Sequence, residues 1–221
     1  MPLTELEQAW LVPDVSVERV ELDATSWVDV ARGLVAGADA LHDELAATVP
    51  WQVSKVWRYE KYIEEPRLAS WQSGAGRHPA LIAVQTWITR RYRVSFDGVS
   101  LVQYRDERDS VGWHRDRELR WLDDTVIGVL TLGAHRPWLL RPINGRRESY
   151  EDDDLANAVD LSPRSGDLLV MGGRTQADWL HAVPKVRGRV TSRVSAQWRW
   201  TSKRGRRDTN PGFYAPRNFS R

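Results

Sequence analysis

Five short apolar runs after residue 98 limit the folds that are open to this chain. They read GVSLVQYR, TVIGVLTLG, RPWLLRP, GDLLVMGG and RVSAQWRW, and turn-forming residues separate them. Short runs rich in Val, Leu and aromatic residues, with Gly, Pro and Asp between them, are typical of β-strands. We therefore expect residues 98–200 to form an antiparallel sandwich or barrel.

The N-terminal part of the chain has a different pattern, which predicts helices. Apolar residues recur at helical spacing in residues 24–49, with Thr25 or Ser26 as the N-cap. The segment 79–92, PALIAVQTWITRRY, has proline in its first turn and predicts a second helix. Residues 50–78 are aromatic, charged and irregular. Helices followed by many short strands indicate an α+β fold with a helical layer on a β core.

The absence of cysteine restricts the chemistry of any site in the chain. None of the 221 residues is Cys, so disulfides, thiolate zinc sites and cysteine nucleophiles are excluded. A metal ion would have to be held by histidine and carboxylate.

No apolar run is long enough to span a membrane, and MPLTELEQAW is not a signal peptide. We therefore expect a cytoplasmic protein without membrane association, and a monomer by default.

Charge and tryptophan content leave two interpretations open. The net charge is only +2, but acidic residues cluster in EDDD (151–154) and basic residues in RGRVTSR and SKRGRR near the C-terminus. A local basic face could bind phosphates; a solvated Arg-rich tail explains the same pattern. The 12 Trp residues suit either a core or platforms on which bases stack.

One short motif suggests a metal site. His114 and Asp116 lie two residues apart in VGWHRDRE, and on a strand such residues point to the same face. A solvated turn would contain the same pair by chance. His181, in TQADWLHAVPK after a late strand, would complete a set of two imidazoles and one carboxylate, although a purely structural histidine is the alternative there. That set suits non-haem Fe(II) and leaves coordination positions open.

The last predicted strand places arginines on one face. Alternate residues of TSRVSAQWRW form a polar face of Arg193, Ser195, Gln197 and Arg199 and an apolar face of Val194, Ala196, Trp198 and Trp200. Arginines inside a barrel need anionic partners, because an unpaired buried charge is costly. A dicarboxylate co-substrate would supply them. On an exposed sheet face the same arginines would merely be solvated.

Together these segments resemble the core of the AlkB family, Fe(II)- and 2-oxoglutarate-dependent dioxygenases that repair alkylated nucleobases. The resemblance spans roughly residues 60–200 and rests on LVQYRDERDSVGWHRDRE, TLGAHRPWLLRP, SGDLLVMGGRTQADWLHAVPK and RVSAQWR. EEPRLASW and DSVGWH are closer to the eukaryotic-type nucleic-acid demethylases. The resemblance implies one structural domain: a helical and nucleotide-recognition segment (1–97) packed on one sheet of a double-stranded β-helix, or jelly roll (98–200), and a basic tail (201–221).

Carried over residue by residue, the resemblance implies a catalytic site. The Fe(II) ligands would be His114, Asp116 and His181. The residues implied to bind 2-oxoglutarate are Tyr104 by a hydrogen bond, Arg193 at the distal carboxylate, and Arg199 near the metal-side end. The family pattern has Asn at the positions of Val102 and Ser195, so this chain would make fewer hydrogen bonds around 2-oxoglutarate.

The substrate residues follow less directly from the resemblance. Trp71 is the candidate aromatic wall opposite His114, with a core or surface tryptophan as the alternative. Glu118 is what remains of an acidic pair that reads the exocyclic amine of the base. Arg67 and the basic segments that include Arg187, Arg189, Lys203 and Arg204 would hold phosphates.

The resemblance implies direct-reversal repair, in which methyl groups are removed oxidatively from bases of DNA or RNA. The base would be single-stranded or flipped out of a duplex, because its target atom cannot be reached inside the stack. Two alternatives remain open from the residues. The same dioxygenase chemistry could act on a protein or a small molecule, or the chain could be a non-catalytic relative that binds nucleic acid.

Overall fold

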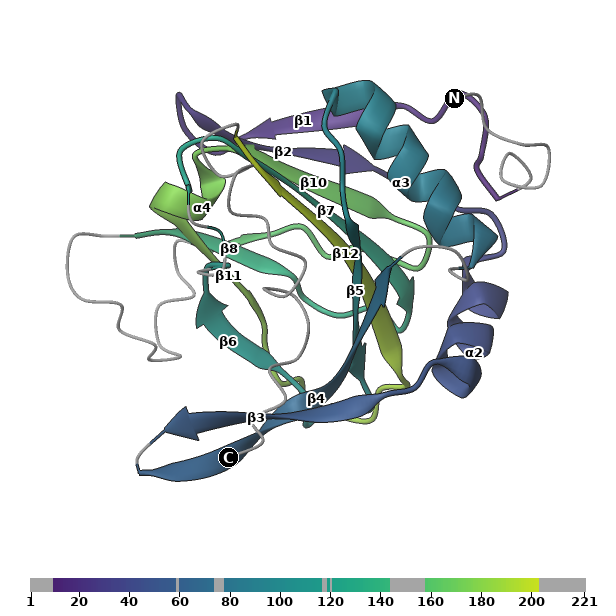
Figure 1. Cartoon of the computed structure of the whole chain (residues 1–221), viewed down its shortest axis with the longest axis vertical. Coiled ribbons are helices and arrows are strands. Elements are labelled where there is room, and N and C mark those ends of the chain that lie inside the picture. The colour runs from purple at the N-terminus through teal and green to yellow at the C-terminus, as the bar shows by residue number, and fades with distance from the viewer. Residues whose placement is uncertain are drawn as a thin grey trace.

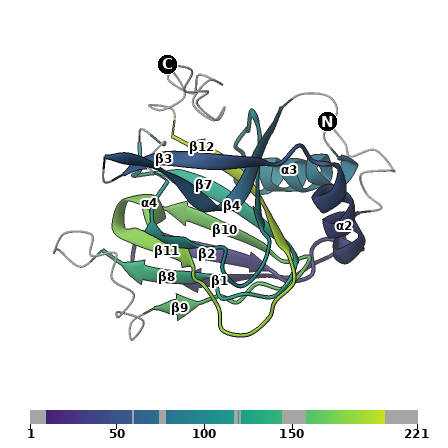
Figure 2. The same ribbon diagram turned by 90° about the horizontal axis from the view of Figure 1, so that it is seen from below.

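A computed structural model of the chain describes residues 10–58, 60–73, 78–116, 119, 121–143 and 158–202. Two β-sheets pack face to face, and two helices cover the outer side of the larger sheet (Figures 1 and 2). This arrangement is the predicted jelly-roll core with helices packed on one sheet. No helix in the described part of the chain has the length and apolar character that a membrane crossing requires.

The larger sheet has eight strands, all paired antiparallel. Their order across the sheet is β1 (Val17–Glu21), β2 (Ser26–Ala31), β10 (Leu168–Gly173), β7 (Thr125–Gly133), β12 (Arg193–Thr201), β5 (Gly98–Tyr104), β4 (Lys61–Ser73) and β3 (Gln52–Arg58). The smaller sheet has the order β6 (Val111–His114), β11 (Trp179–Val183), β8 (Leu139–Pro142) and β9 (Val159–Asp160).

Three helices accompany the sheets among the described residues. They are α2 (Ala38–Thr48), α3 (Pro79–Tyr92) and the single turn α4 (Thr175–Asp178). The sequence predicted α3 with the same bounds, and His78 caps it by accepting a hydrogen bond from the Ala80 N–H at 3.1 Å. Helix α4 connects β10 to β11 and lies beside the smaller sheet.

Strand β12 separates two apolar cores. Its residues Val194, Ala196 and Trp198 are fully buried in the core between the larger sheet and the helices. The opposite face of the same sheet contributes Tyr104, Val129 and other residues to a second core between the two sheets. The alternation predicted for β12 is therefore present, and its polar face points toward the space between the sheets.

The single helix predicted for residues 24–49 is wrong. Residues Ser26–Ala31 form β2, and the helix begins only at Ala38. The Asp23 carboxylate accepts hydrogen bonds from the Thr25 and Ser26 N–H groups, at 2.7 and 2.8 Å, and so closes the β1–β2 turn. Thr25 and Ser26 are therefore turn and strand residues and not a helix N-cap.

Two glycines explain where the chain changes from strand to helix. Gly33 and Gly37 have φ of 61° and 63°, a left-handed conformation that residues with a Cβ adopt only at a cost. Gly37 occupies the N-cap position of α2. Between β2 and α2 the backbone thus turns twice, and a continuous helix through this segment is excluded.

Residues 50–78, for which the sequence predicted neither a helix nor a strand, contain the β3–β4 hairpin, which projects from one end of the larger sheet (Figure 1). The partly buried face of β4 carries the polar Glu65 and Arg67 beside Ile63, whereas the apolar Val53 and Tyr62 are exposed. Apolar residues therefore do not mark the buried face of this hairpin, and its sequence shows no alternation of apolar and polar residues. The pairing also shifts between Val53 and Lys55, which interrupts the period further.

The described residues of the segment 1–97 consequently contribute four strands as well as two helices, and the larger sheet contains strands from both 1–97 and 98–200. The acidic run 151–154, Glu118 and the tail beyond Ser202, with Lys203 and Arg204, lie outside the described residues.

Candidate metal and co-substrate site

The structure brings His114, Asp116 and His181 together. Strand β6 ends at His114, Asp116 follows two residues later, and His181 lies in the middle of β11. Antiparallel pairing places His181 directly opposite His114, with ring centroids 4.2 Å apart. One potential ligand atom from each of the three side chains lies within 4.8 Å of the others, so the three residues can bind a single ion.

Both imidazoles are neutral at neutral pH. Burial lowers the pKa of His181 to about 3, and it also lowers the pKa of His114. His114 Nδ1 lies 2.9 Å from the Gly112 carbonyl oxygen; since a carbonyl only accepts, Nδ1 carries the proton and donates it. The lone pair of a neutral His114 ring is then on Nε2, and such an imidazole is the form that binds metals.

Asp116 provides the negative charge of the site. Burial alone would raise the pKa of Asp116, but the positive charge of the Arg199 guanidinium holds it well below its usual range. Arg199 Nε donates to Asp116 Oδ2 at 2.9 Å. An ionised carboxylate with two neutral imidazoles is the donor set that fits Fe(II).

Arg193 fits an anionic ligand. The side chain is fully buried, and its Nη2 donates to Thr131 Oγ1 at 3.0 Å. Its Nε and Nη1 have no hydrogen-bond partner among the residues that the structure describes. Burial lowers the pKa of Arg193 to about 10, which leaves it charged at neutral pH. A buried cation with two unused donors is suited to a carboxylate that accepts both.

Tyr104 lies next to Arg193. The two residues are cross-strand partners on β5 and β12, and the Arg193 guanidinium carbon is 6.0 Å from the Tyr104 ring centroid. Burial raises the pKa of Tyr104, so its hydroxyl is protonated at neutral pH and can donate a hydrogen bond. This arrangement is compatible with the role that the resemblance implies for Tyr104.

Val102 and Ser195, where the chain departs from the AlkB pattern, are also cross-strand partners on β5 and β12. Both side chains are buried, and both line the same cavity. The two positions are therefore adjacent in space although they are far apart in the sequence.

A cavity of about 240 Å³ between the sheets joins these residues. Its walls include seven of the residues that the sequence selected, namely Arg67, Trp71, Tyr104, His114, Asp116, His181 and Arg199. Arg193 does not line the cavity; it lies beside the lining residues Tyr104 and Ser195 on the same face of the sheet.

The predicted substrate residues have mixed positions. Trp71 is half-buried in the cavity wall, and its indole lies over Gly98, where a Cβ would be 2.7 Å from Trp71 Cζ2. Arg67 was predicted to hold phosphate, but in the structure its Nη2 donates to Glu65 Oε1 at 2.8 Å within the cavity wall. Glu118 is not described, so its predicted role stays a prediction.

Three residues of the site were not selected from the sequence. Glu65 lines the cavity, Trp138 stacks on His181 with ring centroids 5.5 Å apart, and Gln176 accepts a hydrogen bond from the Asp116 N–H at 2.9 Å. Glu65 and Trp138 stand in segments already singled out, EEPRLASW and RPWLLRP. Gln176 carries no signal in the sequence that would point to Asp116.

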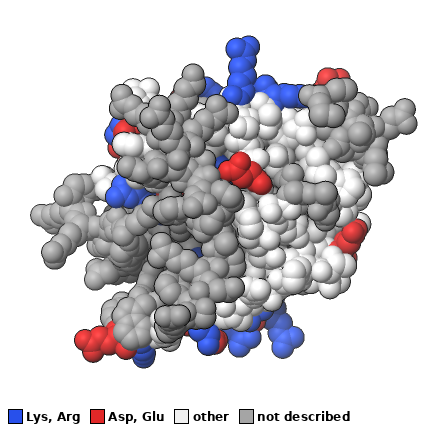
Figure 3. All heavy atoms as spheres, viewed as in Figure 1, with Lys and Arg blue, Asp and Glu red and all other residues white. Residues whose placement is uncertain are grey.

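On the face in Figure 3, Lys and Arg gather mainly at the upper and lower rims, and much of the right half is uncharged. Arg187 and Arg189, in the loop between β11 and β12, are exposed. Exposed arginines of this kind are available to phosphate groups.

The chain is similar to known oxygenases. Residues 16–207 match the model of the 2OG-Fe(II) oxygenase superfamily. The chain is 31% identical over 161 residues to a Bos taurus protein named alpha-ketoglutarate-dependent dioxygenase alkB homolog 3, covering 67% of this chain and 56% of that protein. It is 30% identical over 122 residues to the DNA oxidative demethylase ALKBH2 of Arabidopsis thaliana, covering 47% of this chain and 37% of that protein.

The chain thus spans a little over half the length of the alkB homolog 3 protein that it matches. Among solved structures, a prolyl hydroxylase from Trichoplax adhaerens has a TM-score of 0.59 at 10% identity, covering 82% of this chain and 86% of that chain. An identity this low supports the shared fold alone. Taken with the family match and the converging His-Asp-His set, the comparisons show that the chain belongs to the 2OG-Fe(II) oxygenase superfamily and, within it, to the AlkB family.

Proposed function

We propose that the chain catalyses Fe(II)- and 2-oxoglutarate-dependent oxidative demethylation of alkylated nucleobases in DNA or RNA. The observation that supports this proposal is the meeting of His114, Asp116 and His181 in one cavity next to Arg193, a buried arginine with unused donors. The names of the relatives, alkB homolog 3 and DNA oxidative demethylase, support a nucleic-acid substrate.

The residues have distinct tasks in this proposal. His114, Asp116 and His181 would hold Fe(II), which together with 2-oxoglutarate and dioxygen supplies the oxidation of an N-methyl group. Arg193 and Tyr104 would bind and orient the distal carboxylate of the co-substrate. Arg199 keeps Asp116 ionised and in place through its 2.9 Å hydrogen bond.

The opposite part of the cavity would receive the base. Trp71 offers an aromatic surface, and the Glu65–Arg67 pair offers an acceptor and a donor. A base can reach this cavity only when it has left the stack, and a methyl group that blocks pairing makes this step less costly. The exposed Arg187 and Arg189 would hold the flanking phosphates, and binding would then weaken with added salt. We further place the enzyme in the cytoplasm as a monomer, which cell fractionation and light scattering would test.

The proposal is tested by measuring formaldehyde and succinate with a panel of methylated oligonucleotides. The panel contains single-stranded and double-stranded DNA and RNA, each with one base methylated at a ring nitrogen. We expect formaldehyde and succinate in equal amounts with at least one member, and neither product with His114→Ala. Turnover of 2-oxoglutarate that no oligonucleotide increases would favour a protein or small-molecule substrate. Tight oligonucleotide binding without succinate would favour a non-catalytic relative.

A further inference from the structure

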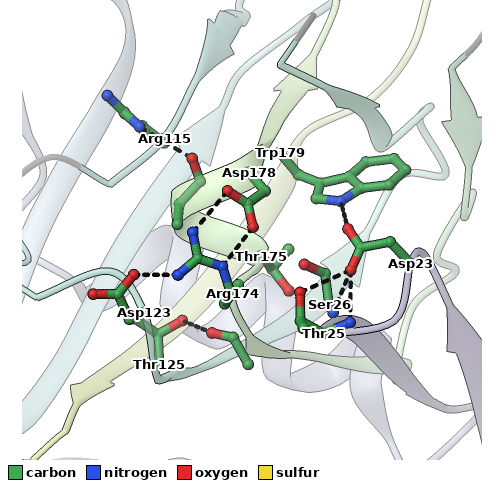
Figure 4. Close-up of polar contacts among 12 residues, drawn as sticks. Asp23, Thr25, Ser26, Arg115, Asp123, Thr125, Arg174, Thr175, Asp178 and Trp179 are labelled. Carbon is green, nitrogen blue, oxygen red and sulfur yellow. Dashed lines mark hydrogen bonds and ion pairs between the residues drawn. The ribbon is translucent and has the colours of Figure 1, made fainter.

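The short helix α4 contacts both segments that carry the metal ligands (Figure 4). It ends at Asp178 and leads directly into β11, which carries His181. On its other side, α4 contacts Arg115, the residue that follows His114 in the sequence. Arg115 Nη1 donates to the Ala177 carbonyl at 3.2 Å. Helix α4 is thus in contact with the chain on each side of the metal site.

Gln176 on α4 holds the backbone of Asp116. The Gln176 side chain is fully buried, and its Oε1 accepts from the Asp116 N–H at 2.9 Å. A backbone N–H can only donate, so the amide oxygen must face Asp116, and the Gln176 Nε2 then lies 3.6 Å from Met171 Sδ. Both ends of the amide are therefore engaged inside the protein.

Asp116 needs such a contact because it lies beyond the β-ladder. The pairing of β6 with β11 fixes His114 opposite His181, but β6 ends at His114. The Asp116 N–H is held by the Gln176 side chain, and the Asp116 carbonyl accepts from the Leu119 N–H at 3.2 Å. The Asp116 carboxylate is held separately by Arg199.

Helix α4 is itself fixed to the β1–β2 hairpin (Figure 4). The Arg174 N–H, at the start of the helix, donates to the Thr25 carbonyl at 3.0 Å. After the helix, Trp179 Nε1 donates to Asp23 Oδ2 at 2.6 Å. These contacts involve no metal ligand, so α4 has a fixed position before any ion binds.

We propose that Gln176 is a positioning residue for the metal, which fixes Asp116 relative to His181 and assembles the three ligands in advance. Partners that orient metal ligands commonly change metal affinity by 10- to 100-fold when they are removed. The inference rests on the metal site and does not depend on the identity of the substrate.

The test is the affinity of the full chain for Co²⁺, a redox-stable stand-in for Fe(II), measured by calorimetry without 2-oxoglutarate or nucleic acid. Gln176→Met has a similar volume but leaves the Asp116 N–H without its acceptor. We expect its Kd for Co²⁺ to rise about 10- to 100-fold. If this variant does not fold, Gln176→Asn, one methylene shorter, carries the same prediction with a smaller rise.

The matched control is Arg174→Ala. It removes the partly exposed ion pairs that the Arg174 side chain forms with Asp178 and Asp123, but leaves Gln176 in place. We expect its Kd to stay within about twofold of wild type, since exposed ion pairs contribute little. A folded Gln176→Met variant that binds Co²⁺ as tightly as wild type would overturn the inference. An equal loss in Arg174→Ala would also overturn it, because general loosening of α4 would then be the cause. Neither result depends on whether the chain demethylates bases.

Discussion

His114 and His181 face each other across the antiparallel pair β6–β11, with ring centroids 4.2 Å apart. Backbone pairing sets this separation, so two of the three metal ligands are held in place by the fold itself. Both rings are neutral and one is stacked on Trp138, which keeps them ready to bind an ion at neutral pH. Replacing a single metal-ligand side chain should therefore weaken metal binding but leave the two sheets folded.

Metal binding should stabilise the protein through His181. A ligand at 100 times its Kd adds about 2.7 kcal/mol to the free energy of unfolding, which corresponds to a rise in Tm of roughly 5–10 °C for a chain of this size. We expect Co²⁺ to produce this rise in wild type and EDTA to reverse it. In His181→Ala the rise should disappear, whereas the exposed His135→Ala should retain it. Differential scanning fluorimetry measures all four cases.

Arg193→Met should weaken co-substrate binding and stabilise the free protein. Losing a buried partner of a carboxylate costs about 3 kcal/mol, so the KM for 2-oxoglutarate should rise roughly 100-fold. Without 2-oxoglutarate, the same change removes a buried cation that has two unused donors, and the free energy of unfolding in urea should increase by about 1–2 kcal/mol. A variant that is destabilised without ligand would contradict the assignment of Arg193 to an anion site.

Arg136 should be important for stability. Its fully buried guanidinium donates to three carbonyls, of Asp106, Asp109 and Pro184, at 2.7–2.9 Å. These carbonyls belong to the loops that follow β5 and β11. Arg136→Met should lower the free energy of unfolding by roughly 3 kcal/mol, because buried carbonyls lose their donors. The control Arg108→Ala removes an exposed ion pair and should change it by less than about 0.5 kcal/mol.

The contact between Asp23 and Trp179 should depend on pH. Burial would raise the pKa of Asp23, but hydrogen bonds from Trp179, Thr25 and Ser26 lower it from 3.8 to about 2. A lowered pKa in the folded state means that this carboxylate stabilises the protein fully above about pH 4 and loses its effect as the pH falls toward 2. The difference in Tm between wild type and Asp23→Asn should therefore be largest above pH 4 and shrink between pH 4 and 2. A difference that stays constant over this range would refute the assignment.

The parts of the fold that could be predicted are those in which the sequence pattern coincides with burial. Strand β12 alternates because one face lies under the helices and the other faces the second sheet. Helix α3 carries its own start signal in Pro79 and has buried residues along one side. In both elements the local sequence pattern agrees with the tertiary environment, so the pattern alone predicts the element.

The parts that could not be predicted depend on contacts made elsewhere. The apolar spacing in β2 also suits a helix, and the left-handed Gly33 and Gly37 decide against one. The partly buried face of the β3–β4 hairpin carries charged residues, so its sequence shows no apolar period. In the site, the order of His114, Asp116 and His181 was visible in the sequence. The hydrogen bond between Gln176 and Asp116 could not be predicted from the sequence, because it joins a side chain to a backbone N–H 60 positions away.

Val102 and Ser195 lie opposite each other on neighbouring strands. Both side chains line the same cavity, so an asparagine introduced at one position would lie next to the residue at the other. Substitutions of residues in contact are commonly not additive. The change in the binding free energy of 2-oxoglutarate in the double replacement of Val102 and Ser195 by asparagine should therefore differ from the sum of the changes in the two single replacements.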